Sequence, residues 1–337
     1  MNSKIPYFLL VILFFLGIDI NISFSRELLI YSYDSFNSKW GPGPVVFKRF
    51  KKKCGCKVKV VSQGDSGKVL NQVILEKSNP KADILIGLNN SELEKSFNYD
   101  LWEPYTSKLL DQVPVDLRVD KKNRVTPFDY GFIAFVYDSY KLNSPPKSLE
   151  DLINKKYRKK IVIQNPRTSS PGLSMMHWTI SVFGEEGYLD YWKKLQPNLL
   201  TMTDGWSAAY GMFTKGEVPI VLSYSTSPAY HLEYEKTERY KAARFIEGHY
   251  RQIEFAGIIR GTKNIELAKG FIDFMLSEEF QSVIPLKNWM FPVVEHQPLP
   301  HSFRIVPKLK KIQELDPTRV HQQNSKWIKA WSRAMSE

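Results

Sequence analysis

Short runs of β-branched and aromatic residues alternate along this sequence with segments of helical periodicity. Each run is bounded by turn-forming residues, which is typical of a strand buried in a sheet. The six predicted strands occupy residues 27–33, 57–62, 82–88, 132–138, 160–164 and 219–225. Helical patterns are clearest at residues 45–52, 67–78 and 264–284, where Asn264 is placed to cap the last segment. This alternation predicts α/β layers with largely parallel sheets.

The length of the chain suits two such α/β units. The chain has 337 residues, which is more than one compact domain usually contains. No internal repeat or low-complexity linker divides the sequence. We therefore expect two lobes that are joined by ordered strands.

The first 25 residues have the pattern of a secretory signal peptide. Lys4 precedes an apolar run at residues 7–18, which is shorter than the roughly 20 residues that a membrane-spanning helix needs. Ser23 and Ser25 occupy the −3 and −1 positions of a cleavage site before Arg26. The segment contains no cysteine that could carry a lipid. We expect residues 1–25 to be removed and the mature protein to be exported without a lipid anchor.

The chain carries an excess of basic residues, with 47 Lys and Arg against 35 Asp and Glu and a formal net charge of +12. The basic runs are scattered, at residues 48–53, 155–160 and 308–311. Such scattered charges favour solvated surfaces over a nucleic-acid site, and an exported protein rarely meets nucleic acid. We expect no nucleic-acid partner.

The two cysteines, Cys54 and Cys56, are separated by one glycine. Two thiols alone cannot complete a structural zinc site, and an oxidising compartment favours either a disulfide or an inert pair. A Cys54–Cys56 bridge would close a small ring. Both states of the pair are compatible with the sequence.

Eight motifs rich in aromatic residues, glycine and proline follow one another at residues 31–36, 40–46, 127–138, 165–174, 204–213, 222–231, 247–250 and 288–293. In this order, and over essentially the whole mature chain, they resemble the periplasmic thiamine-binding proteins of thiamine ABC importers. The resemblance implies a type II periplasmic-binding-protein fold, in which two α/β lobes enclose a ligand cleft and crossover strands act as a hinge. We expect lobe 1 to comprise residues 26–130 and 253–337, and lobe 2 to comprise residues 131–252.

The resemblance also implies the biological role. It predicts a periplasmic carrier, not an enzyme, that binds thiamine or its mono- and diphosphate esters and needs no cofactor and no metal. The expected partners are the membrane permease and ATPase subunits of an ABC importer, and the carrier is expected to be a monomer. The sequence does not rank the three forms of the vitamin.

The resemblance assigns ligand contacts to individual residues. Trp206, Tyr230 and Trp289 would surround the thiazolium ring, with Tyr33 nearby. Asp65 would anchor the aminopyrimidine, and Ser169 would contact the phosphate end. The complete predicted set is Tyr33, Asp65, Ser66, Ser169, Ser170, Trp206, Tyr224, Tyr230 and Trp289, with Asp34, Trp40, Thr168 and Ser227 as second-rank candidates.

Thiamine has the chemistry that these residue types recognise. Its thiazolium ring is permanently cationic, and an aromatic face attracts a cation by about 0.5 to 2 kcal/mol. The TSSPG segment at residues 168–172 can begin a helix, where free backbone N–H groups favour an anion. Each residue also has a structural interpretation. Asp65 can cap the helix that follows it, and Trp327 and Trp331 lie at helical spacing that indicates packing.

Two other functions are considered. A thiaminase of the first type is similar in fold and uses a cysteine nucleophile, but the only cysteines here follow a basic helical segment. A ferric-ion carrier would use paired tyrosines such as Tyr224 and Tyr230, but the sequence shows no evident histidine and carboxylate partners.

Overall fold

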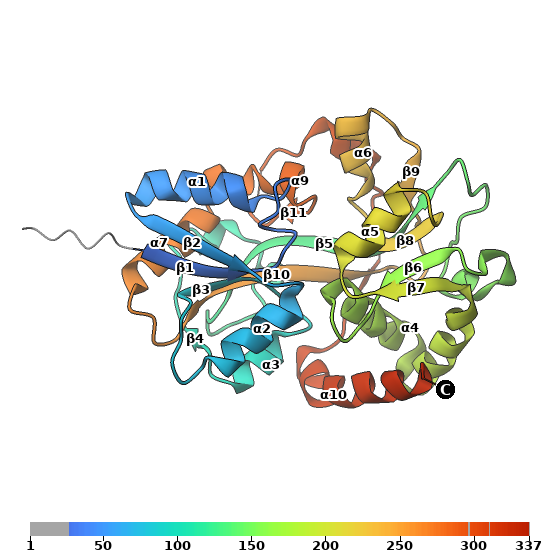
Figure 1. The fold of residues 1–337 in the computed structure, drawn as a ribbon, viewed down its shortest axis with the longest axis horizontal. Coiled ribbons are helices and arrows are strands. Elements are labelled where there is room, and N and C mark those ends of the chain that lie inside the picture. Colours follow the sequence, from blue (N-terminus) through green and yellow to red (C-terminus); the bar gives the residue numbers. More distant parts are fainter. Residues whose placement is uncertain (1–26, 296, 310, 337) are drawn as a thin grey trace, which may run out of the picture.

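The structure is a computed structural model that describes residues 27–295, 297–309 and 311–336. The predicted signal peptide, residues 1–25, lies outside the described residues. In the described part of the chain, no helix is long and apolar enough to cross a membrane. Two α/β lobes are visible in Figure 1.

The first lobe is a sheet with helices on both faces. The strand order is β2-β1-β3-β10-β5, and β1 runs parallel to both of its neighbours. The lobe begins with β1 (Glu27–Ser32), α1 (Gly43–Cys54), β2 (Lys57–Ser62), α2 (Ser66–Leu75), β3 (Ile84–Asn89), α3 (Leu93–Asn98) and β4 (Trp102–Glu103). Later segments complete it: α7 (Ile265–Met275), α8 (Glu278–Gln281), α9 (Ile284–Lys287) and β11 (Phe291–Pro292).

The second lobe repeats this layered arrangement. Strand β6 lies between β8 and β7 and is parallel to both. The elements are β6 (Ile161–Gln164), α4 (Ser170–Leu195), β7 (Leu199–Thr203), α5 (Trp206–Thr214), β8 (Ile220–Tyr224), α6 (Pro228–Glu235) and β9 (Tyr240–Ala242). The short β12 (Ile312–Gln313) and the helix α10 (Pro317–Ala334) follow near the C-terminus.

Two long strands, β5 (Thr126–Asp138) and β10 (His249–Ile259), belong to both lobes. They run from one lobe into the other through the middle of the molecule (Figure 1). The first part of β5 pairs antiparallel with β10, and its second part, from Ile133 to Tyr137, pairs antiparallel with β8. Every residue of β10 is buried. The lobes are therefore joined by ordered strands, as the sequence predicts.

Each lobe has its own hydrophobic core, and the C-terminal helix joins the second one. One cluster contains buried residues of β1, β3 and α7, and the other contains the apolar residues of α4. Trp327 and Trp331 of α10 pack in this second cluster, where the Trp331 ring lies edge-on to Trp192 at 5.4 Å. The predicted division places residues 317–334 in lobe 1, whereas the packing of α10 assigns these residues to the core of lobe 2. The reason is that the apolar face of α10 covers α4.

The predicted helix at residues 264–284 is divided into α7, α8 and α9. Ser277 has an extended backbone conformation that ends the first segment and precedes the next. Asn264 precedes α7, but its side chain does not cap the helix. Instead, its Nδ2 donates to the carboxylate of Asp83 at 3.2 Å. A single continuous helix and an Asn264 cap are thus wrong predictions, because the extended backbone at Ser277 interrupts the helix and the Asn264 side chain is bonded to a distant carboxylate.

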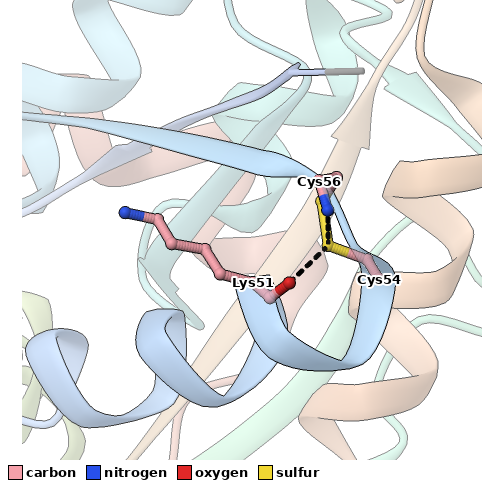
Figure 2. Close-up of a disulfide and its surroundings, with 3 residues drawn as sticks. All are labelled: Lys51, Cys54 and Cys56. Carbon is pink, nitrogen blue, oxygen red and sulfur yellow. Dashed lines mark hydrogen bonds between the residues drawn. A yellow bond between two sulfur atoms is a disulfide. The ribbon is translucent and has the colours of Figure 1, made fainter. Parts of the chain in front are cut away.

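Cys54 and Cys56 form a disulfide at the junction of α1 and β2 (Figure 2). Gly55, between them, has a left-handed backbone with φ of 59° and ends α1 by donating its N–H to the carbonyl of Lys51. A residue with a side chain rarely adopts this conformation, so glycine suits the tight reversal. The bridge uses both cysteines of the chain, and no free thiol is left.

Candidate ligand-binding site

A cavity of about 540 Å³ is lined by residues of both lobes. This volume is typical of small-molecule sites. Tyr33 and Asp65 reach it from the first lobe, Ser170 and Trp206 from the second, and Trp289 from the segment that returns to the first lobe. The cavity is therefore a place where one ligand could contact both lobes.

One wall of the cavity is formed by the start of α5. The Trp206 ring stacks on Tyr210 at 4.7 Å between centroids, with 16° between the ring planes. Its Nε1 donates to the hydroxyl of Ser223 at 2.8 Å, and the exposed ring of Trp40 lies 6.1 Å away. These contacts fix the orientation of the indole, so that its ring is available to the cavity. We call Trp206 and Tyr210 the aromatic wall.

Three further rings form what we call the aromatic corner: Tyr230 and Tyr234, one turn apart on α6, and Trp289. The Trp289 ring lies edge-on to Tyr230 at 5.4 Å and to Tyr234 at 5.7 Å. Trp289 has a left-handed backbone with φ of 57°, which is rare for a bulky residue. Its carbonyl accepts a hydrogen bond from the Thr226 hydroxyl, just before α6. Such a conformation persists only where its surroundings hold it, as this corner does.

Two carboxylates lie opposite each other on the strands that join the lobes. Glu254 of β10 pairs in register with Asp129 of β5, next to an irregularity in the pairing between Glu254 and Phe255. Irregularities of this kind redirect side chains and are frequent beside functional sites. Glu254 lines the cavity, and Asp129 is completely buried behind it. We call this pair, with its partners Tyr33 and Asn288, the acidic cluster.

Neutral side chains hold the acidic cluster in place. The Tyr33 hydroxyl donates to Glu254 Oε2 at 2.7 Å, and Asn288 Nδ2 donates to Asp129 Oδ2 at 2.6 Å. Among the described residues, Asp129 Oδ1 has no hydrogen-bond partner. The Tyr33 ring can occupy its position only because residue 87 is glycine, since a Cβ on Gly87 would lie 2.1 Å from that ring.

The environment of the acidic cluster favours bound protons. Burial, together with the negative charge of Asp65, raises the pKa of Glu254 to about 8, although the hydrogen bond from Tyr33 acts in the opposite direction. Burial also raises the pKa of Asp129 well above its usual range, and Glu254 adds to that effect. Two buried carboxyl groups in this position resist double ionisation. A ligand cation beside them would lower both pKa values and release protons.

Asp65 connects the two lobes. It caps α2 by accepting from the Ser66 N–H at 3.0 Å, so the predicted capping role is present. The same carboxylate accepts from the Ser169 hydroxyl of the second lobe at 2.6 Å and from the Ser170 hydroxyl at 3.4 Å. Burial raises the pKa of Asp65, and the Ser169 hydrogen bond lowers it. Asp65 and Ser169, which the resemblance assigns to different ends of the ligand, are therefore in direct contact.

Seven of the nine predicted residues line the cavity: Tyr33, Asp65, Ser170, Trp206, Tyr224, Tyr230 and Trp289. Ser66 and Ser169 lie behind them. Ser66 donates its hydroxyl to the buried carboxylate of Glu92 at 2.8 Å, and Ser169 supports Asp65. Of the second-rank candidates, Trp40 and Ser227 line the cavity, but Asp34 and Thr168 do not. The Thr168 hydroxyl instead donates to the carbonyl of Asp204.

The cavity-lining residues that the sequence interpretation missed include Glu254, Asn288, Tyr210, Tyr234 and Lys287. For Glu254 a signal exists, since an acidic residue inside a strand that is buried along its whole length needs a partner. Asn288 begins one of the recognised motifs. Tyr210 lies within the motif at residues 204–213. Tyr234 and Lys287 could be recognised only from the way their elements pack.

The residues that a thiaminase or a ferric-ion carrier would use occupy different places in the structure. Both cysteines are bridged at the end of α1 and do not line the cavity. Tyr224 and Tyr230 do line it, and Tyr224 accepts a hydrogen bond from Gln252 at 2.7 Å. Within the described ranges, no group of three or more histidine, cysteine, aspartate or glutamate residues is arranged to hold a metal ion.

A family profile described as bacterial extracellular solute-binding protein matches residues 79–312. Among curated proteins, the thiamine-binding periplasmic protein of Brucella melitensis is 46% identical over 92% of this chain and 92% of its own length. The corresponding protein of Escherichia coli is 43% identical over 92% of this chain and 93% of its own length. A solved periplasmic thiamin-binding protein superposes with a TM-score of 0.87 at 43% identity, over 92% of this chain and 96% of that one.

More distant solved structures share the fold alone. A ferric ion-binding protein from Pasteurella haemolytica superposes with a TM-score of 0.77 at 18% identity, over 92% of this chain and 98% of its own. Together with the two lobes and shared strands, these similarities confirm the predicted type II periplasmic-binding-protein fold.

Proposed function

We propose that the cavity of this protein captures thiamine, because the chain belongs to the bacterial extracellular solute-binding proteins and, among them, to the thiamine-binding periplasmic proteins. The protein is a periplasmic substrate-binding protein that supplies an ABC importer. Its relatives are named as binding proteins, not as enzymes. A thiaminase or a ferric-ion carrier is not favoured.

One observation carries the assignment of ligand chemistry: the cavity combines aromatic faces with buried carboxylates that have only neutral hydrogen-bond partners. Glu254 is held by Tyr33 and Gln252, and Asp65 by serines. The pKa values of these buried groups are raised, and a cationic ligand would stabilise their ionised form. Aromatic rings favour the same ligand through their negative faces. Thiazolium satisfies both requirements.

In the proposed complex, each part of thiamine meets a different group of residues. The thiazolium ring lies between Trp206 and the aromatic corner, within the field of the acidic cluster. The aminopyrimidine donates its amino group to Asp65, as the resemblance implies. The ligand thereby contacts both lobes, and its higher affinity for the closed form shifts the population toward closure.

The remaining features of the carrier follow from the sequence interpretation. Residues 1–25 direct export and are removed, the mature chain acts as a monomer, and the closed form is recognised by the permease of the importer. The lobe boundaries at residues 130/131 and 252/253 place the hinge within β5 and β10, where both strands pass between the lobes.

The test uses the mature protein, residues 26–337, after unfolding and refolding to remove any bound vitamin. Calorimetry with thiamine should give a Kd of about 1 μM or lower, which corresponds to roughly −8 kcal/mol. Tryptophan fluorescence should change on titration, because Trp206 and Trp289 line the cavity. A neutral analogue with an uncharged ring in place of thiazolium serves as the control and should bind much more weakly. Absence of both heat and a fluorescence change with thiamine would refute the proposed function.

A further inference from the structure

Behind the aromatic wall lies a buried histidine that does not line the cavity. His231 is on α6, and both of its ring nitrogens have partners. Its Nδ1 lies 2.8 Å from Oε2 of Glu235, one turn later on the same helix, and its Nε2 lies 2.9 Å from the hydroxyl of Tyr210. The ring of Tyr240 packs against the imidazole at 4.0 Å between centroids. His231 therefore connects an exposed carboxylate to one ring of the aromatic wall.

The Tyr210 hydroxyl belongs to a longer row of polar groups. It also receives a hydrogen bond from the Ser227 hydroxyl. The hydroxyls of Ser227 and Ser223 lie 2.7 Å apart, and Ser223 accepts from Nε1 of Trp206 at 2.8 Å. Both serines are buried, and buried hydroxyls are normally hydrogen-bonded. The row thus runs without a break from the indole at the cavity to the carboxylate of Glu235.

The two ends of this row give it one direction. An indole nitrogen can only donate a hydrogen bond, and a carboxylate can only accept one. The imidazole proton therefore lies on Nδ1 and is donated to Glu235, which leaves Nε2 to accept from the Tyr210 hydroxyl. Each hydroxyl between the two ends then donates once and accepts once. Burial lowers the pKa of His231 below its ordinary value, although Glu235 acts in the opposite direction, and only the neutral ring has an acceptor nitrogen.

We propose that His231 is a positioning residue for ligand binding: it accepts from Tyr210, sets the direction of the row, and thereby fixes the indole of Trp206 at the cavity. This inference rests on the proposed function, because it concerns the affinity of the same site for thiamine. The Tyr210 ring stacks on Trp206 at 4.7 Å, so the hydroxyl and the ring of Tyr210 hold the same wall. Without His231, the ligand has to order these two rings when it binds, and ordering side chains on binding costs affinity.

The experiment compares two substitutions at this position with a matched control. His231→Leu removes the acceptor and keeps an apolar side chain, whereas His231→Gln can still accept from Tyr210 through its side-chain carbonyl. The control is His249→Leu. His249 is also buried, packs against Trp178 of the second lobe, bonds to backbone groups and does not line the cavity. Calorimetry on the mature protein measures the Kd for thiamine, and thermal unfolding measures the stability of each variant.

We expect His231→Leu to weaken thiamine binding about fivefold, because two rings of the wall lose their fixed orientation. His231→Gln should recover most of the lost affinity. His249→Leu should leave the Kd unchanged, even if it lowers thermal stability. A loss in His249→Leu as large as that in His231→Leu would overturn the proposal, since any buried histidine of this lobe would then have the same effect.

A double-mutant cycle with Tyr210→Phe separates positioning from packing. Tyr210→Phe keeps the ring and removes the hydroxyl, so His231→Leu should cost no further affinity in that background. An equal loss with and without the Tyr210 hydroxyl would contradict the proposal. Histidine NMR of isotope-labelled wild-type protein should show the His231 proton on Nδ1, and a proton on Nε2 would overturn the proposal. The tautomer is measured without any variant, so it decides the question even if His231→Leu does not fold. Wild-type protein that bound no thiamine would instead refute the proposed function.

Discussion

The acidic cluster and the aromatic groups of the cavity differ in how the chain holds them. Asp129 and Glu254 lie on β5 and β10, the strands that both lobes share, and their positions depend on strand register. The rings of Trp206 and Tyr230 lie near the starts of α5 and α6 in the second lobe, and their positions depend on ring contacts. The carboxyl groups of the acidic cluster therefore belong to the frame that joins the lobes, whereas the aromatic faces belong to one lobe and the returning segment.

This difference predicts that the two regions respond differently to substitution. A change in the acidic cluster should alter binding through charge, with a dependence on pH and little dependence on ring size. A change in the aromatic groups should alter binding through contact area and ring character, at every pH. Five measurements can separate these effects.

The largest effect is expected for Glu254→Gln, which removes a buried carboxylate beside the cation. Loss of one partner of a buried charge contact costs roughly 3 kcal/mol, so thiamine should bind about 100-fold more weakly. Calorimetry on wild type and variant measures this loss. Glu92→Gln is the matched control, because Glu92 is also buried, with a pKa that burial raises to about 7, but does not line the cavity. Equal losses in both variants would show that buried charge in general, not the acidic cluster, sets affinity.

A smaller loss is expected for Trp206→Leu, which keeps an apolar side chain and removes the aromatic face. The thiazolium should bind about 10- to 30-fold more weakly, in keeping with one desolvated cation–π contact. Trp206→Phe should recover most of the affinity in the same titration. Either change removes the Trp206 Nε1 donor to the Ser223 hydroxyl, but that hydroxyl still has Ser227 as a partner at 2.7 Å. If leucine and phenylalanine bound thiamine equally well, Trp206 would contribute only apolar area.

Thiamine affinity should rise about tenfold between pH 6 and pH 8 and then level off. The pKa of Glu254 is about 8 without ligand and falls when a cation binds, so binding below pH 8 must release a proton. Calorimetry in buffers of different ionisation enthalpy counts the released protons. In Trp206→Leu the same pH dependence should persist at lower affinity, whereas in Glu254→Gln it should largely disappear.

The unliganded protein should show the opposite trend in stability. The folded-state pKa of Glu254 is raised above its ordinary value of 4.5, so the native state binds more protons than the unfolded state between these values. The contribution of this group to the free energy of unfolding is therefore largest below about pH 4.5 and is lost as the pH rises through about 8. Thermal unfolding of wild type and Glu254→Gln over this range measures the difference, and parallel curves would contradict it.

The smallest effect is expected for Asp65→Asn, at the border between the two regions. An asparagine can still accept from Ser169 but loses the charge and half of the acceptor sites, so affinity should fall about three- to fivefold. Ser169→Ala removes the cross-lobe donor and leaves the carboxylate. If Asp65 contacts the ligand, calorimetry should show a larger loss for Asp65→Asn than for Ser169→Ala. A larger loss for Ser169→Ala would mean that Asp65 acts mainly by joining the lobes.

The sequence predicts the local features of this molecule well. Strands such as β2 and β6 match their predicted ranges closely, because buried β-branched runs leave a clear periodic signal. The aromatic contacts at Trp206 and Tyr230 are indicated by motifs that stand next to helix starts. The Asp65 cap is likewise a local property, since the residue and the helix it caps are adjacent.

Features that depend on distant pairing could not be predicted in this way. Glu254 and Asp129 are 125 residues apart in sequence and meet only through the register of β10 on β5. The attachment of α10 to the second core depends on the packing of Trp327 against α4. The sequence shows the helical spacing of α10 but not this contact. Lys287 lies beyond the expected long helix, at the end of α9, and lines the cavity through the packing of that short helix. Tertiary contacts decided each of these outcomes.

The sharing of β10 between the lobes also governs the order in which the chain can fold. In the first lobe, β3 pairs with β10, and Leu85 lies opposite Gly257. This edge of β3 therefore stays unpaired until β10 has been synthesised. A chain that emerges N-terminus first has to produce all of α4 to α6 before that partner arrives. Pairings of such long sequence separation form slowly, because the intervening loop must be closed first. The sheet of the first lobe is thus completed only after the strands of the second lobe have been made.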